Sequence, residues 1–372
     1  MREISAVELM LAVKELQNLV SSSFKGMRQL GEGSFLIEFS RERKNVALYI
    51  KLNRLVCETR FVEEKTEQSD FASVVKKKLE GNTLTSIEQH DSDRIIVMSF
   101  EGATKRELII EMLGKGNVVL VNEKKVVELS YRGHAYKERQ MLTGSPYVFP
   151  KSDTVDYDQI DEQKAKQIVE SLKIEKEKLI VALAKQVNLG PIYLEDIIRR
   201  AGLNPKEGTA TQLEKGSKQL ELQILDFFRR IKEPKPRIYV KDGKYVDFSA
   251  VPLLKYEELE KNALKFKTMG ELFDSVSIEE RSSEVDEEKT REFEELSKSA
   301  EKLKTQIKEL QEKSKAYAEI ANKVFERMHE VNSAIEQVKK STNARECVGM
   351  KFGTVSIKGI DAKNKIAKVE IE

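Results

Sequence analysis

The stretch 189–205, LGPIYLEDIIRRAGLNP, has the residue order of a turn, a helix and a second turn. Gly190 permits a tight turn, and the unpaired backbone amides at the start of the following helix can bind phosphate. Arg199 and Arg200, at the end of that helix, can face phosphate or can stabilise the helix end by their charge. The stretch therefore indicates either a clamp on a nucleic-acid backbone or two amphipathic helices joined by a Gly-Pro turn.

Asp93 and Arg94 open a second segment of interest, DRIIVMSFEG (93–102). An arginine at the start of a strand can bind a phosphate through two hydrogen bonds or stack on an unpaired base. The alternative is an exposed ion pair between neighbours, which contributes little to stability. The residues alone leave both interpretations open.

Further cationic positions lie in turns and loops. Lys115 stands between two glycines, which let another backbone approach closely. Arg132 and His134 share a loop with Tyr136 and Lys137, a mixture of cations and aromatic rings that suits stacking on RNA. Ordinary solvation is the alternative for each of them.

Glu8 and Lys77 lie on expected helices. Glu8 follows Ser5 at the spacing of a capping box, in which the two residues exchange hydrogen bonds at the start of a helix. Lys77 is the middle residue of three consecutive lysines, and only part of that run can share one helical face. Phosphate contact and solvation are equally open for the lysine run.

The composition limits the possible functions. The net charge is only +2, so any nucleic-acid site must be a local patch. Cys57 and Cys347 are far apart, and no P-loop or dinucleotide-binding motif occurs, so we expect no metal, nucleotide or other cofactor. No apolar run approaches the about 18 residues of a membrane span, and we expect a cytoplasmic protein without a membrane partner.

The first half of the chain predicts a β-rich domain over residues 1–160. An apolar stripe over 4–20 and the run 71–81 predict helices. Short apolar runs broken by turn residues over 24–61 and 93–133 predict strands and hairpins. We expect an α+β fold whose N-terminal domain is β-sandwich-like.

The next two segments differ in the spacing of their apolar residues. Residues 161–232 read as helices, whereas 233–280 begins with a proline-rich extended stretch. We expect the second segment to return strands to the N-terminal domain, which would make the helical segment an insertion.

A heptad pattern dominates the rest of the chain. Apolar residues recur every three or four positions from Phe293 to Val338, and 271–348 contains neither glycine nor proline. This pattern predicts a coiled-coil arm over 281–342. The last segment, 343–372, reads as a hairpin too small to be stable alone, so we expect it to be the start of a truncated middle segment.

The helical segment resembles the helix–two-turn–helix of formamidopyrimidine-type DNA glycosylases. The matching residues are Gly190, Ile192, Tyr193, Glu195, Ala201, Gly202 and Pro205. Those enzymes attack with an N-terminal proline amine, but this chain has Arg2 there and no proline before Pro146. Pro191 stands where the glycosylases have an asparagine that contacts phosphate, and the cysteines of their zinc finger are missing. A DNA glycosylase or lyase is therefore a poor alternative, and we expect no enzyme.

The whole chain resembles the N-terminal portion of the NFACT family of ribosome-associated quality-control factors. The resemblance is carried by SAVELMLAVKEL (5–16), DRIIVMSFEG (93–102), LIIEMLGKGNVVLVN (108–122), RGHAYKE (132–138), SPYVFP (145–150), LGPIYLEDIIRRAGL (189–203) and the 281–340 arm. It implies a glycosylase-type N-terminal domain with an inserted helix–two-turn–helix domain, followed by a long coiled-coil arm.

The resemblance also implies a function. Family members bind tRNA and the split large ribosomal subunit that carries a stalled nascent chain. They recruit aminoacyl-tRNA for C-terminal tailing without mRNA, and a ubiquitin ligase or protease-pathway partner would bind through the coiled coil. The family's tRNA-engaging pair falls on Asp93 and Arg94, and a further family acid, usually Asp, falls on Glu8. A coiled-coil adaptor without RNA selectivity remains the alternative.

Overall fold

The computed structural model describes residues 2–42, 44–59, 69–134, 139–151, 154–361 and 363–372. Its contacts divide the chain into two units, Met1–Ser282 and Ser283–Glu372. The finer domain boundaries expected from the sequence stay predictions. Among the described residues, no helix is both long enough and apolar enough to cross a membrane.

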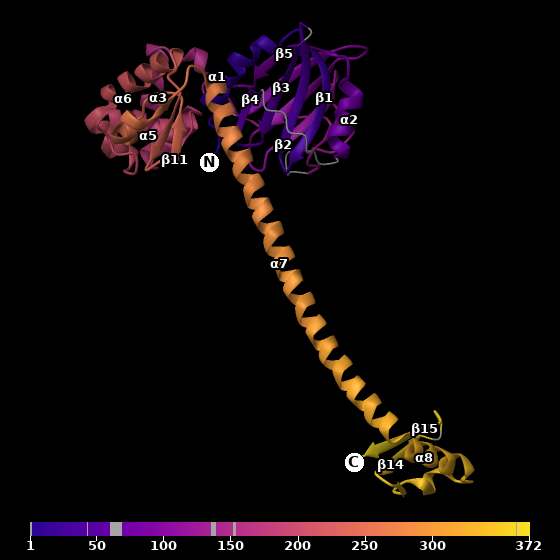
Figure 1. Ribbon diagram of the computed structural model, residues 1–372. Coiled ribbons are helices and arrows are strands. Elements are labelled where there is room, and N and C mark those ends of the chain that lie inside the picture. Colours follow the sequence, from indigo (N-terminus) through magenta and orange to yellow (C-terminus); the bar gives the residue numbers. More distant parts are fainter. Residues whose placement is uncertain (1, 43, 60–68, 135–138, 152–153, 362) are drawn as a thin grey trace. The chain divides into compact units, whose positions relative to one another are not determined.

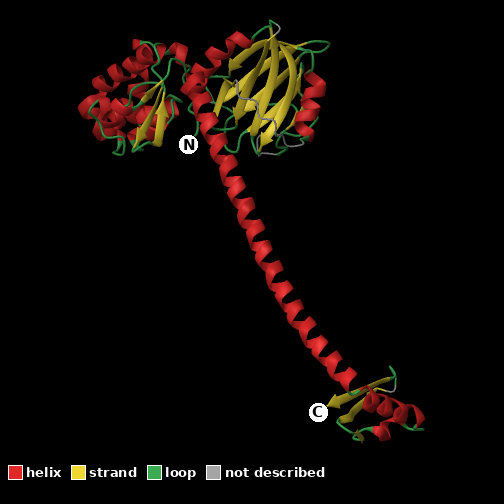
Figure 2. Ribbon diagram, in the orientation of Figure 1, coloured by secondary structure: helices red, strands yellow, loops and turns green. Residues whose placement is uncertain are grey.

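A nine-stranded antiparallel sheet is the largest element of the first unit (Figure 2). Its order is β4-β3-β2-β1-β5-β6-β7-β8-β9. The strands are β1 (Ser23–Gly31), β2 (Ser34–Arg41), β3 (Lys44–Lys51), β4 (Leu55–Thr59), β5 (Thr83–Gln89), β6 (Ile95–Glu101), β7 (Arg106–Glu111), β8 (Asn117–Asn122) and β9 (Val127–Ser130). The predicted strands are thus present, and the expected mixed α and β composition is confirmed.

The sheet consists of two halves that are joined weakly and face each other. β1 and β5 share a single register pair, Ser23 with Thr83. Phe39 from the first half stacks on Phe100 from the second, and Phe35 meets the edge of Tyr131 with ring centroids 4.9 Å apart. Burial of these rings between the halves gives the first unit much of its apolar core.

Two helices pack against the sheet. α1 (Ala6–Glu15) begins with the predicted capping box, because Ser5 Oγ accepts from the Glu8 amide and Glu8 Oε2 accepts from the Ser5 amide. α2 (Asp70–Leu79) lies beside β1 and is followed by Gly81 in the left-handed region (Figure 1). Both helices bury residues at three- and four-residue spacing, as the apolar stripes predict.

The helical segment contains α3 (Glu162–Leu172), α4 (Leu179–Gln186), α5 (Pro191–Arg200) and α6 (Thr209–Lys232). The strands after it form a separate sheet with the order β11-β10-β12 and do not extend the nine-stranded sheet. These strands are β10 (Arg237–Lys241), β11 (Lys244–Ser249) and β12 (Leu264–Lys265). β10 pairs with β11 on one edge and with β12 on the other. The expected return of this segment to the N-terminal domain stays a prediction.

The predicted arm is a helix, but it is shorter than the heptad pattern suggests. α7 (Met269–Glu326) ends before Arg327, whose backbone is not helical (φ −110°, ψ 23°), and α8 (Met328–Lys340) follows. In the described part of α7, four side chains of the predicted heptad seam are more than half exposed: Leu303, Ile307, Leu310 and Tyr317. The structure shows a long helix with an unpaired apolar face, and the coiled coil stays a prediction.

The second unit has a small core that the sequence did not predict. α8 packs on a sheet of β13 (Lys351–Phe352), β14 (Val355–Asp361) and β15 (Ile366–Ile371). Ala334, Cys347, Val355 and Ile357 are buried there. The end of the heptad pattern therefore covers this sheet instead of continuing the arm. The predicted hairpin is present as β14 and β15, and β13 and α8 complete its core. That this segment starts a longer middle segment stays a prediction.

Replacing one apolar residue in each place separates the core from the seam. Ile357→Ala should destabilise the second unit by about 2–5 kcal/mol, because it empties a buried site. Ile307→Ala, at an exposed seam position, should change the free energy of unfolding by about 0.5 kcal/mol or less. Urea unfolding followed by circular dichroism checks both. A comparable loss in Ile307→Ala would show that the seam is buried against a partner helix.

Candidate nucleic-acid interface

Five loops of the first unit meet at one end of the nine-stranded sheet, which we call the loop edge. The loops are 32–33, 52–54, 90–94, 112–116 and 131–134. The side-chain amide of Asn53 donates to Gly114 O, the Gly33 amide donates to Tyr131 Oη (3.2 Å), and the Met112 amide donates to Arg94 O (2.7 Å). These bonds bring together cationic residues that are widely separated in the sequence.

Asp93 and Arg94 do not form an ion pair with each other. The Asp93 carboxylate is buried and accepts from the Arg94 backbone amide (2.7 Å) and from Asn188 Nδ2 (3.1 Å). Arg94 Nη1 instead donates to Glu3 Oε2 (2.6 Å) and, at 3.4 Å, to Ile4 O. Asp93 thus connects the turn before β6 to the turn before α5, while the Arg94 guanidinium faces the N-terminal segment.

Lys115 and Arg132 form one local unit. Arg132 donates to the carbonyl oxygens of Lys115 and Gly116, the latter at 2.8 Å, and to Glu32 Oε1 at 3.0 Å. Gly116 has φ +71°, and a Cβ there would lie 2.7 Å from the Leu52 Cβ, so this turn requires glycine. Lys115 is exposed at the tip of the turn that Arg132 supports.

His134 is exposed at the same loop edge, two residues beyond Arg132. Tyr136 and Lys137 lie outside the described residues. The loop edge therefore brings together Asp93, Arg94, Lys115, Arg132 and His134, as candidate nucleic-acid contacts would require.

Glu8 belongs to a buried hydrogen-bonded group, which we call the Glu8 network (Arg2, Ser5, Glu8, Tyr193, Asp247). Tyr193 Oη donates to Glu8 Oε1 (2.6 Å), and Arg2 binds the same carboxylate and Asp247 Oδ1 (2.9 Å). The Arg2 guanidinium also lies 3.9 Å from the centre of the Phe248 ring. The carboxylate has no exposed surface, so Glu8 is held as an internal residue and its cap is confirmed.

The environment of Glu8 favours its charged form. Burial alone would raise the pKa, but the charge of Arg2 and the hydrogen bonds from Arg2, Tyr193 and Ser5 outweigh burial and hold the pKa of Glu8 below its ordinary value. Burial and the neighbouring Glu8 charge raise the pKa of Tyr193 well above its ordinary value, so its hydroxyl remains a donor.

Gly190 allows the N-terminal ends of α1 and α5 to lie in close contact. It has φ +90°, and a Cβ there would lie 2.8 Å from the Cβ of Ser5, the N-cap of α1. The glycine therefore lets the start of α5 lie against the start of α1. A phosphate clamp at this turn stays a prediction.

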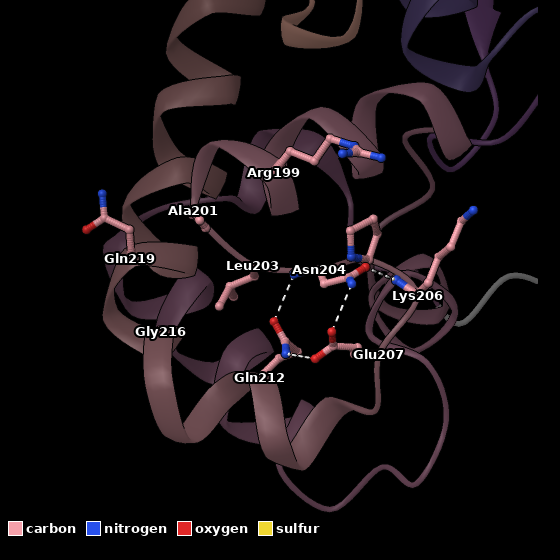
Figure 3. A pocket seen from close by; sticks show the side chains of 11 residues that line it. Arg199, Ala201, Leu203, Asn204, Lys206, Glu207, Gln212, Gly216 and Gln219 are labelled. Atoms are coloured by element: carbon pink, nitrogen blue, oxygen red, sulfur yellow. Dashed lines mark hydrogen bonds between the residues drawn. The ribbon is translucent and has the colours of Figure 1, made fainter.

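Arg199 and Arg200 have different surroundings. Arg199 pairs with Glu195 (2.8 Å) and lines a cavity of about 890 Å³ with Asn204, Lys206 and Gln219 (Figure 3). Arg200 Nε donates to the buried Asp196 (2.8 Å). Asp196 also binds Arg230 and the Leu254 amide, so Arg200 belongs to a structural ion-pair group.

Lys77 is not part of the loop edge. Its neighbour Lys78 pairs with Glu128 (3.0 Å), which also binds Arg106, the first residue of β7. The loop edge lies at the other end of β7, after Glu111. The sequence run of lysines gave no indication of this separation, because it depends on how α2 lies along β1.

The sequence reasoning missed the carboxylates that pair with these cations. Glu3 and Glu32 pair with Arg94 and Arg132, and the buried Glu111 binds Arg139 (2.7 Å). Each pair joins residues far apart in the chain, so no local spacing could have indicated it. Within the described ranges, no group of three or more His, Cys, Asp or Glu residues could hold a metal ion.

Glu8→Gln should destabilise the first unit by about 3 kcal/mol, because it removes a fully buried charge and leaves the half-buried Arg2 with only one carboxylate partner. Glu3→Gln, at a partly exposed pair, should cost about 1 kcal/mol or less. Urea unfolding at pH 7 checks both values. Equal effects would mean that the Glu8 network is not the stronger interaction.

The same network predicts a dependence of stability on pH. Because the folded-state pKa of Glu8 lies below its unfolded value of 4.5, its contribution is present above pH 4.5 and is lost as pH falls through the folded pKa. The difference in unfolding free energy between wild type and Glu8→Gln should therefore shrink in that acidic range. A difference that stays constant from pH 7 to pH 3 would contradict this linkage.

Similar proteins agree on one family. The model for the NFACT N-terminal and middle domains matches residues 6–352. The archaeal Rqc2 homolog aRqcH of Methanocaldococcus jannaschii is 23% identical over 363 residues, which cover 91% of this chain and 52% of that protein. Ribosome quality control complex subunit 2 of Saccharomyces cerevisiae is 28% identical over 126 residues, 33% of this chain and 12% of that protein.

A solved structure shares the fold. The fibrinogen binding protein from Staphylococcus aureus superposes with a TM-score of 0.57 at 20% identity, over 73% of this chain and 97% of that one. This chain spans about half the length of its archaeal relative. Because the model for the NFACT N-terminal and middle domains covers nearly all of the sequence, the chain belongs to the NFACT family.

Proposed function

We propose that this chain is part of a ribosome-associated quality-control factor that binds tRNA through the loop edge. The observation that carries the proposal is the convergence of Arg94, Lys115, Arg132 and His134 on one end of the sheet. The names of the relatives, Rqc2 homolog and ribosome quality control complex subunit 2, support the quality-control part of the proposal.

Local charge would supply the binding energy. With a net charge of +2, the chain has no general attraction for nucleic acid, so the arginines and lysine at the loop edge must make the phosphate contacts. The exposed imidazole of His134 would add a ring on which an unpaired base can stack. Asp93 would act through position, because its carboxylate orients the backbone that carries Arg94.

The wider function follows from the family. The factor would bind the split large ribosomal subunit that carries a stalled nascent chain and would recruit aminoacyl-tRNA for mRNA-independent C-terminal tailing. It would act in the cytoplasm without an active site of its own, on a glycosylase-type scaffold with an inserted helix–two-turn–helix domain. Its coiled coil would bind a ubiquitin ligase or protease-pathway partner.

One observation favours a second candidate, a coiled-coil adaptor without RNA selectivity. The seam of α7 is exposed over several turns, and such a face is typical of a helix that pairs with another. An adaptor of this kind does not need the loop edge, so charge changes at Arg94 would leave its binding intact.

Single substitutions at the loop edge test the proposal. Arg94→Ala and Lys115→Ala should each weaken the binding of labelled, unfractionated tRNA by about five- to thirtyfold in anisotropy titrations, because each removes a cation from the interface. Lys77→Ala, at an exposed lysine away from this edge, should change the affinity less than about twofold. Equal affinities for all three variants would refute the assignment of the loop edge.

The full role is tested with ribosomes. The chain should cosediment with split large subunits, and sequencing of the copurified RNA should recover tRNA. The DNA-lyase alternative predicts a covalent adduct on abasic DNA after borohydride reduction, whereas the proposal predicts none. Recovery of such an adduct, with no tRNA enrichment, would replace the proposed function with an enzymatic one.

A further inference from the structure

Four arginines in and around the loop edge differ in the exposure of their carboxylate partners. Arg2 and Arg139 pair with Glu8 and Glu111, whose side chains are 0% and 5% exposed. Arg94 and Arg132 pair with Glu3 and Glu32, whose side chains are 55% and 86% exposed. The four arginine side chains themselves are similarly exposed, at 16–23%, so the two kinds of pair differ in the exposure of the carboxylate alone.

The two outer arginines have further acceptors besides their glutamates. Arg132 donates to the carbonyl oxygens of Lys115 and Gly116 and lies 5.0 Å from the centre of the Tyr131 ring. Arg94 donates to Ile4 O at 3.4 Å, and the Asp93 carboxylate fixes its backbone. Each guanidinium therefore keeps at least one backbone carbonyl acceptor when its glutamate moves away.

The energetic difference between the two kinds of pair is large. Moving Glu8 or Glu111 away would leave a buried carboxylate without its arginine and far from water, which is costly. Separating the Arg94 and Arg132 pairs costs less, because water solvates the released glutamates and each guanidinium keeps a carbonyl acceptor. A phosphate can then bind the freed guanidinium through two charge-assisted hydrogen bonds. Arg94 and Arg132 can be released to an anionic ligand at small cost, whereas Arg2 and Arg139 cannot.

We propose that Glu3 and Glu32 are displaceable counterions, which occupy Arg94 and Arg132 in the free protein and yield them to RNA phosphates. This inference rests on the proposed function and adds two residues that set the affinity of the chain for tRNA. The carboxylates oppose binding, since a phosphate must separate each pair and then lie near a like charge.

Glutamine substitutions test the counterion role on the full 372-residue chain. Glu3→Gln and Glu32→Gln should each tighten the binding of labelled, unfractionated tRNA by about two- to fivefold. The control is Glu101→Gln, because Glu101 has the same 55% exposure as Glu3 but pairs with Lys105 at the end of β6 remote from the loop edge. An equal gain in Glu101→Gln would reduce the effect to net charge and overturn the inference.

A double substitution separates direct from general effects. In an Arg94→Ala background, Glu3→Gln should no longer tighten binding, because the guanidinium that Glu3 occupies is gone. A gain that persists in this background would contradict the counterion role. If Arg94→Ala weakens binding but Glu3→Gln never strengthens it, only the counterion role fails. If wild type and Arg94→Ala show the same affinity, the proposed function fails.

Discussion

The candidate site depends on the hydrogen bonds and the ion pair that the buried carboxylate of Glu8 makes. The carboxylate caps the helix in which it lies, accepts a hydrogen bond from the hydroxyl of Tyr193 in α5, and neutralises Arg2. Arg2 in turn donates to Asp247 and to Phe248 O, both in β11. One charged group thus joins the N-terminal segment, the helical segment and the small sheet, and it stays ionised in the interior because its partners compensate for lost hydration.

The position of the N-terminal segment decides the geometry of the loop edge. The Ile4 amide donates to Asn53 O (2.9 Å), and the Asn53 side chain reaches Gly114 beside Lys115. Arg94 binds Glu3 and the carbonyl of Ile4. Residues that contact no ligand in the proposal therefore place those that do, and the Glu8 network is their common support.

Local signals in the sequence predicted the elements well. The Ser5–Glu8 spacing gave the capping box, and alternating apolar runs gave the strands of the large sheet. Local signals could not decide the pairing where a segment had two possible partners. β10 satisfies both of its edges within its own segment, and the heptad pattern continues past Arg327 because the face of α8 that covers a sheet has the same period as a coiled-coil seam.

The candidate site was predictable only in part, for a related reason. Glycines and cations in turns indicated Lys115 and Arg132, since those signals are local. The sequence could not place Lys77 away from them, nor could it show that Arg200 is held by the buried Asp196. Cations are common on protein surfaces, and their availability depends on which carboxylate the fold brings to them. At this site the buried carboxylates stabilise the fold, while the exposed ones leave their arginines able to exchange partners.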